Sequence, residues 1–168
     1  MTSIPAEFVD WVGLRFASVG ESERVALDDM EMRFAIKYSE GLFHVLRWER
    51  STGPFSVASF LRELDAVRQL MLTLGGDGRS INSLARLSVP LELPASVASV
   101  SLVQTEAGST ELTWDEGGER HLGIFRKSRF GQMDARRFAQ CIGATIPELA
   151  DSLKSADGGP LFSTVESA

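Results

Sequence analysis

Histidine and cysteine are the side chains that most often serve as general bases, nucleophiles or metal ligands, and this chain has few of them. Its two histidines are His44 and His121, and its one cysteine is Cys141. Each histidine lies within an apolar run that is typical of a strand, without a carboxylate or a second histidine at the spacing of a metal site. We therefore expect both histidines to have structural or surface roles.

Cys141 could pair with a histidine in three dimensions and act as a nucleophile. It lies beside Phe138 and Ile142 on the apolar face of a predicted helix. A reactive thiol needs an accessible, electropositive site, so a small buried apolar residue is the favoured interpretation. A single cysteine also excludes an internal disulfide and a thiolate metal cluster. The sequence thus predicts no catalytic residue, no metal and no cofactor.

A glycine-rich segment at residues 75–80 is superficially similar to a phosphate-binding loop. Such loops lead from a strand into a helix, whose N-terminus then faces the anion. Here the glycines follow a helical pattern, so we expect Gly75 to end that helix and a tight turn to follow. In this structural motif, which includes Asp77, the guanidinium of Arg79 would satisfy carbonyls at the helix end, and the hydroxyl of Ser80 would hold the following backbone.

Two charged clusters have simple interpretations. Asp28 and Asp29, with Glu31 nearby, could do acid–base chemistry if they converged in a cleft, but they are more typical of a hairpin tip. Residues 126–129 are basic and are interpreted as a solvated loop. The chain carries 17 Lys and Arg against 23 Asp and Glu, a net charge of −6, which disfavours nucleic acid as a partner.

Apolar periodicity predicts the elements that would position these residues. Spacings of three and four indicate helices at 4–16, 60–74 and 132–142, and Thr145 to Glu148 form a capping box at the start of a fourth. Alternating residues indicate strands at 24–28, 32–38, 42–50, 100–104, 111–114 and 120–126, with a hairpin turn at Gly117 and Gly118. This order predicts an α+β fold, a mainly antiparallel sheet packed with an N-terminal helix, a central helix and two C-terminal helices.

The length of 168 residues predicts a single domain, which we place at residues 1–162. Leu161 and Phe162, behind Pro160, are expected to dock on it as an apolar latch, and residues 163–168 are expected to be disordered. No apolar run approaches the roughly 18 residues of a membrane helix, and residues 1–7 have no signal-peptide pattern. We therefore expect a cytoplasmic protein without membrane contact.

Several short motifs, taken in order, resemble a known family. Trp11 lies in the first helix; residues 41–51 form a glycine-led aromatic strand with an Arg-containing end; residues 75–80 precede an apolar residue and Pro90; and residues 157–162 read Asp-Gly-Gly-Pro-Leu-Phe. In pattern and order the chain is similar to actinobacterial immunity proteins, the family that includes the antidote of the tuberculosis necrotizing toxin, an NAD-hydrolysing toxin. The resemblance covers the domain from Trp11 to Phe162.

This resemblance implies a cytoplasmic inhibitor that binds a cognate toxin domain, occludes its NAD site and has no chemistry of its own. The acidic charge would suit a basic toxin face. Aromatic and arginine residues concentrate binding energy, so we expect Glu49, Arg50 and Phe55 to contact the partner. Two other classes remain open: a secretion chaperone or adaptor for a secreted effector, and a small enzyme or ligand-binding domain.

Overall fold

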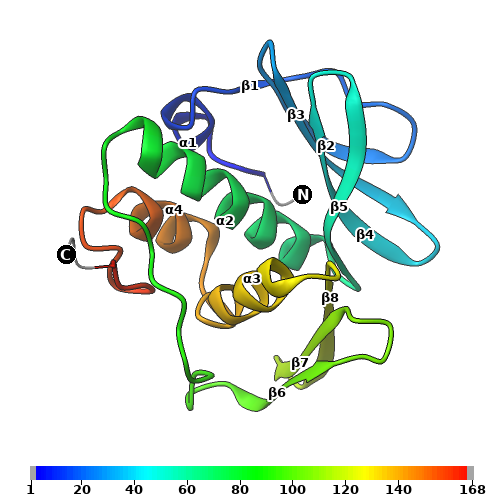
Figure 1. The fold of residues 1–168 in the computed structure, drawn as a ribbon, viewed down its shortest axis with the longest axis vertical. Helices are drawn as coiled ribbons and strands as arrows, with labels where there is room; N and C mark the ends of the chain where they lie inside the picture. Colours follow the sequence, from blue (N-terminus) through cyan, green and yellow to red (C-terminus); the bar gives the residue numbers. More distant parts are fainter. Residues whose placement is uncertain (1–2, 166–168) are drawn as a thin grey trace.

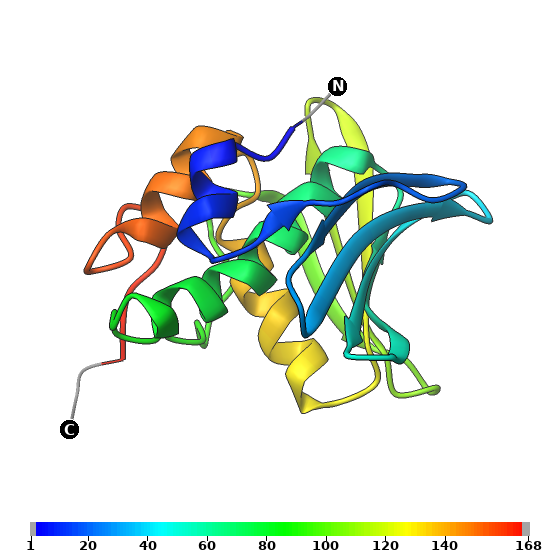
Figure 2. The same cartoon turned by 90° about the horizontal axis from the view of Figure 1, so that it is seen from above.

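The computed structural model describes residues 3–165, which form one curved antiparallel sheet with helices on its inner face (Figure 1, Figure 2). The predicted α+β class is confirmed, as are the N-terminal, central and two C-terminal helices. None of the helices within residues 3–165 is long and apolar enough to cross a membrane. The helices are α1 (Ala6–Trp11), α2 (Glu63–Ile81), α3 (Arg129–Ala139) and α4 (Ile146–Lys154).

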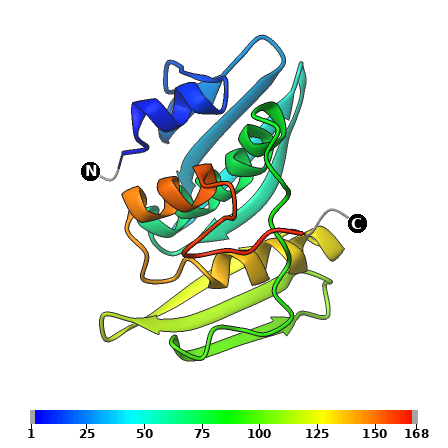
Figure 3. The same ribbon diagram turned by 90° about the vertical axis from the view of Figure 1, so that its left-hand side faces the viewer.

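The described part of the sheet has eight strands in the order β1-β2-β3-β4-β5-β8-β7-β6. Two meanders are therefore joined where Ala58 to Phe60 pair with Gly123 to Phe125. Viewed from the helix side, α2 and α4 lie in front of the first meander and α3 in front of the second (Figure 3). The strands are β1 (Arg15–Phe16), β2 (Glu23–Asp28), β3 (Met32–Ser39), β4 (Leu42–Glu49), β5 (Thr52–Phe60), β6 (Ala98–Gln104), β7 (Thr110–Glu116) and β8 (Glu119–Phe125).

The core lies between the inner face of the sheet and α2. Strand register aligns Ile36, Val45, Ala58 and Phe125 in one row across β3, β4, β5 and β8, and each is at most 1% exposed. Alternation along the strands puts these residues on the same face, where the apolar stripe of α2 covers them. Phe138 of α3 completes an aromatic cluster with Phe60, Trp114 and Phe125.

The predicted turn at the glycine-rich segment is wrong, because α2 continues through it to Ile81. Glycine lowers helix propensity by about 1 kcal/mol, but here it permits close packing. A Cβ added at Gly75 would lie 2.7 Å from the Leu153 side chain of α4, and one at Gly78 would lie 2.4 Å from the Trp11 ring of α1. The two glycines let α4 and α1 approach the α2 backbone.

Other element boundaries also differ from the predictions. No strand was predicted between residues 50 and 60, but Thr52 begins β5, which pairs with β4 and extends to Phe60. The first helix ends at Trp11 rather than at residue 16, because Gly13 turns the chain with a φ of 76°. The basic residues 126–129 lead directly into α3, which Ser128 caps. The turn at residues 117–118, the hairpin tip after Asp28 and the capping box at Thr145 are confirmed.

The C-terminal segment packs on the domain. Leu161 and Phe162 are partly buried against the core, as expected. Residues 163–165, which we expected to be disordered, instead pair with residues 86–88: the Ser88 amide donates to the Ser163 carbonyl over 2.8 Å, and Thr164 forms a bridge with Leu87 (Figure 3). The remainder of the predicted tail, residues 166–168, lies outside the described part of the chain.

Candidate functional site

A network of four charged or ionisable side chains lies at one end of the sheet, which we call the His121 end. Arg68 donates to Asp65 Oδ1 over 3.0 Å, to both Glu116 oxygens over 3.0 and 3.1 Å, and to the Ala144 carbonyl over 2.9 Å. His121 Nδ1 lies 2.9 Å from Asp65 Oδ2. Asp65, Arg68 and His121 are 1%, 3% and 6% exposed. A network this deeply buried is stable only because its members satisfy one another.

Secondary structure positions the network. Asp65 and Arg68 are three residues apart in the first turns of α2, so both face the sheet. Trp114 of β7 pairs with His121 of β8, with ring centroids 5.2 Å apart, and Trp114 Nε1 donates to Glu116 over 3.3 Å. His121 is therefore held between Asp65 and Trp114. Its partners could have been suspected from a charged pair on the apolar face of a helix.

Burial and ion pairing shift the pKa values of the Asp65 and Glu116 carboxyl groups in opposite directions. Burial raises the pKa of Asp65 above its ordinary value, although the hydrogen bond from His121 and the charge of Arg68 oppose that shift. For Glu116, burial also raises the pKa, but the hydrogen bonds and charge of Arg68 outweigh it and the net pKa is lowered. Glu116 therefore remains ionised and holds the Arg68 guanidinium in place.

The network is a poor fit for a metal ion. Asp65, Glu116 and His121 have ligand atoms within 4.8 Å of one another, and their types could bind a divalent cation. However, the Arg68 guanidinium already contacts both carboxylates. A metal ion would have to displace that fixed positive charge or bear its repulsion.

A shallow hollow of about 570 Å³ lies above the network. His121 and Glu116 line it, with residues from the start of α2 and from the β7–β8 turn. No hydroxyl or thiol side chain is among the described residues that line it, so His121 has no nucleophile to activate there. Cys141 is fully buried, and burial raises the pKa of its thiol to about 12, which confirms the interpretation of an inert apolar residue. The lining residues are Phe43, Leu61, Arg62, Glu63, Leu64, Asp65, Glu116, Gly117, Glu119 and His121.

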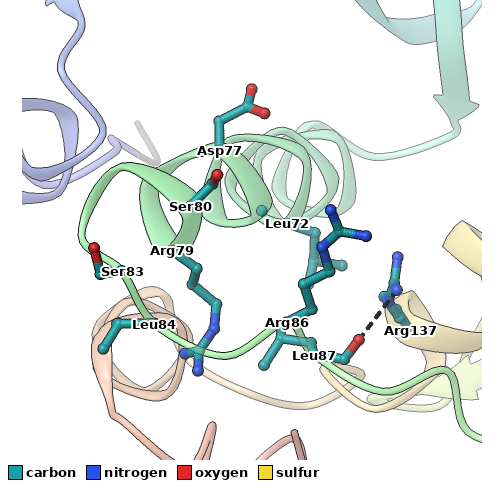
Figure 4. Close-up of a pocket in the computed structure, with 10 residues that line it drawn as sticks. Leu72, Asp77, Arg79, Ser80, Ser83, Leu84, Arg86, Leu87 and Arg137 are labelled. Carbon is teal, nitrogen blue, oxygen red and sulfur yellow. Dashed lines mark hydrogen bonds between the residues drawn. The ribbon is translucent and has the colours of Figure 1, made fainter. Parts of the chain in front are cut away.

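A second hollow of similar size lies beside the last turns of α2 (Figure 4). Arg86 and Arg137 line one side of it, and Arg137 donates to the carbonyls of Leu87 and Ser88 over 3.2 and 3.4 Å. Arg79 is directed toward α4 in Figure 4, where its guanidinium meets backbone carbonyls. Asp77 and Ser80 also line this hollow and point away from Arg79 (Figure 4).

The predicted contact residues Glu49, Arg50 and Phe55 lie at the opposite end of β4, which we call the Arg50 end. Arg50 is at the tip of the β4–β5 turn with a φ of 54°, and its side chain is 79% exposed and 3.8 Å from Glu31. Glu49 pairs with Arg47 over 2.6 Å. Phe55 is 44% exposed on β5, opposite Arg47 in the register. The structure thus brings all three residues to one end of the sheet.

The Arg50 end also contains hollows and exposed apolar groups. A hollow of about 460 Å³ is lined by Glu49, Arg50 and the facing residues of the β2–β3 turn. Met30, in that turn, is 95% exposed, and the Arg50 amide donates to the Glu31 carbonyl, so the two turns are neighbours. Met30 and Phe55 are thus two exposed apolar side chains at the Arg50 end.

Comparison with known proteins gives two similarities. A family model described as Immunity protein 61 matches residues 13–161. The fold is similar to that of Rv3902c from M. tuberculosis, with a TM-score of 0.71 and 15% sequence identity over 96% of this chain and 93% of that chain. No curated protein matches the chain in sequence. The family match confirms the resemblance to immunity proteins that the motifs indicated, whereas the structural similarity, at this identity, concerns the fold alone.

Proposed function

Because the chain belongs to the Immunity protein 61 family, we propose that it neutralises a cognate secreted toxin by covering the active site of the toxin domain. The immunity role follows from the family. The identity of the toxin does not, and we propose an NAD glycohydrolase because the ordered motifs at residues 41–51, 75–80 and 157–162 resemble the family that includes the antidote of such a toxin. Toxin and inhibitor would meet in the cytoplasm of the producing cell.

We propose that inhibition is steric, without chemistry by this chain. No hydroxyl or thiol side chain is among the described residues that line the His121 hollow, and the Arg68 guanidinium already pairs with both carboxylates of the network. Hydrolysis of a dinucleotide would need a site for its phosphates and a group to attack or protonate the sugar. A binding protein needs neither, so these features support an inhibitor.

The observation that carries the choice of contact surface is the exposure at the Arg50 end. Arg50 and Phe55 belong to the residue types that dominate interface energies, and Met30 adds an adaptable apolar contact. The two neighbouring turns and the hollow between them offer a concave surface for a protruding part of the toxin. We therefore place the toxin contact there.

Substitutions with matched controls test this surface. Phe55→Ala or Arg50→Ala should each weaken binding to the toxin domain by about 1 to 3 kcal/mol, because truncating such residues in an interface removes packing and charge-assisted contacts. Phe130→Ala and Arg129→Ala are the controls, since these residues are also exposed but lie on α3. Calorimetric titration of the toxin domain measures all four. If the α3 variants weaken binding and the Arg50-end variants do not, the contact surface is elsewhere.

A further inference from the structure

The hollow at the His121 end presents hydrogen-bond acceptors to whatever enters it. His121 is the most informative of these, because its side chain is only 7% exposed. Its Nδ1 faces a carboxylate, which can only accept, so we assign the proton to Nδ1. In this tautomer Nε2 carries no proton and can accept a hydrogen bond. The ring lines the hollow, and no described residue hydrogen-bonds to Nε2.

The charge of the hollow favours a cation. Glu63, Asp65, Glu116 and Glu119 line it, against the single guanidinium of Arg62 on its wall, with Arg68 beneath. Four carboxylates against two guanidinium groups leave two negative charges. Arg62 itself pairs with Glu119, and both side chains are about half exposed, at 46% and 58%. A guanidinium group therefore already binds to one acceptor of the hollow.

The walls of the hollow are apolar. Leu61 and Leu64 are 47% and 36% exposed, and Phe43, whose ring centroid lies 4.7 Å from that of Tyr38, also lines the hollow. Such walls suit the methylene stem of a long cationic side chain, whose charged end would reach the acceptors at the floor. A bare metal ion would gain nothing from them.

We propose that this hollow binds a guanidinium or ammonium group carried on an aliphatic chain. Glu63, Glu119 and Nε2 of His121 accept its N–H groups, while Leu61 and Leu64 cover its stem. The ligand is either an arginine or lysine side chain of a protein or a free amine of the same chemistry. This site is independent of the toxin contact, because it lies at the opposite end of β4.

The two histidines of the chain give a direct readout, since imidazole ¹⁵N NMR resolves His121 from His44. The probes are agmatine, a free guanidinium compound, and N-acetyl-arginine methylamide, which mimics a residue in a protein. We expect either probe to shift the His121 signals to saturation while those of His44 stay in place. N-acetyl-glutamine methylamide, which is neutral, should shift neither. Binding of both cations would mean that protein side chains can enter, and binding of agmatine alone would assign the site to free amines.

Charge variants sharpen the test. The double variant Glu63→Gln, Glu119→Gln should weaken agmatine binding about tenfold, because two charged acceptors are lost. The double variant Glu21→Gln, Glu106→Gln removes the same charge at exposed positions away from the hollow and should bind like the wild type. Arg62→Gln should strengthen binding, because a competing guanidinium is removed.

Four results would overturn the proposal. The first is that neither cation produces a saturable shift of His121. The second is that both histidines shift together, which indicates an effect of ionic strength. The third is that the Glu63, Glu119 double variant binds agmatine as well as its control does. Zn²⁺ is the remaining probe. If Zn²⁺ saturates the His121 shift at lower concentration than agmatine does, the hollow is a metal site and the proposal is wrong.

Discussion

Arg79 is only 1% exposed, and all three nitrogens of its guanidinium group donate hydrogen bonds. It donates to the carbonyls of Ala85, Leu153, Ser155 and Ala156 over 2.6, 2.8, 2.7 and 3.0 Å. The sequence predicted that this arginine satisfies carbonyls at the end of its own helix. The structure instead directs it to Ala85 and to the end of α4, where Leu153 lies in the last turn and Ser155 and Ala156 follow. The last carbonyls of a helix lack partners within it, so Arg79 closes α4 as well as the segment after α2.

Arg79→Ala should lower the free energy of unfolding by about 3 kcal/mol or more, because several buried carbonyls lose a charged donor. Arg79→Lys keeps the charge but cannot reach all four acceptors, so its free energy of unfolding should lie between those of the wild type and Arg79→Ala. Urea denaturation measures both, and calorimetry measures the affinity of the folded fraction for the toxin domain, which we expect to be unchanged. An alanine variant as stable as the wild type that no longer binds toxin would assign Arg79 to the interface.

Glu116 makes stability depend on pH. Arg68 holds its pKa below the ordinary value of 4.5. The unfolded chain then binds the proton more readily, so this contribution is complete above pH 4.5 and is lost as the pH falls through the lower folded-state pKa. Asp65, whose pKa is raised, acts in the opposite direction and gives more stability as the pH falls.

Comparison with Glu116→Gln isolates this contribution, because Asp65 is present in both proteins. The variant should be less stable than the wild type by about 2 kcal/mol at pH 7, since a buried charged hydrogen-bond pair is broken. The difference should shrink as the pH is lowered below 4.5. Urea denaturation at a series of pH values measures it, with Glu106→Gln as an exposed control. A difference that stays constant down to pH 3 would show that Arg68 does not depend on an ionised Glu116.

The His121 network could not be predicted from the spacing of residues along the chain. Asp65 and His121 are 56 positions apart and meet only because β5 pairs with β8 and α2 follows β5 directly. The spacing of ligands or charges along the chain carries no signal of that pairing. By contrast, the burial of Cys141 was predicted from its apolar neighbours Phe138 and Ile142, although α3 ends at Ala139 and Cys141 lies in the turn after it.

At the scale of elements, local signals succeeded where the turn chemistry is strong. The glycine pair at residues 117–118 and the capping box at Thr145 were predicted correctly, because each depends on residues within a few positions. The end of α2 and the start of β5 were not predicted correctly. Gly75 and Pro54 are typical of turns, but contacts with α4 and pairing with β4 override that tendency.

The glycines of α2 should differ from one another when replaced by alanine. Nothing lies within 4 Å of a Cβ added at Gly76, so Gly76→Ala should raise stability by about 0.5 to 1 kcal/mol through helix propensity. Gly78→Ala should lower it, because the new methyl group would lie 2.4 Å from the Trp11 ring. Urea denaturation of both variants is the measurement. Equal stabilisation by both would mean that α1 does not pack on α2 as closely as described.

At the scale of the whole molecule, the two candidate binding surfaces lie at opposite ends of the sheet. Phe43, near the start of β4, lines the hollow of the His121 end, and Glu49, at the end of the same strand, belongs to the Arg50 end. The helices cover the inner face between them (Figure 2). A toxin bound at the Arg50 end would therefore leave the His121 end accessible.

We propose that this protein stops a toxin by binding it and has no reaction of its own. NAD hydrolysis by a purified candidate NAD-glycohydrolase toxin domain, measured against increasing amounts of this protein, tests that claim directly. We expect activity to fall linearly and to reach zero at one inhibitor per toxin, with a stable complex and with no NAD consumed by this protein alone. NAD turnover by this protein in the absence of toxin would contradict the account.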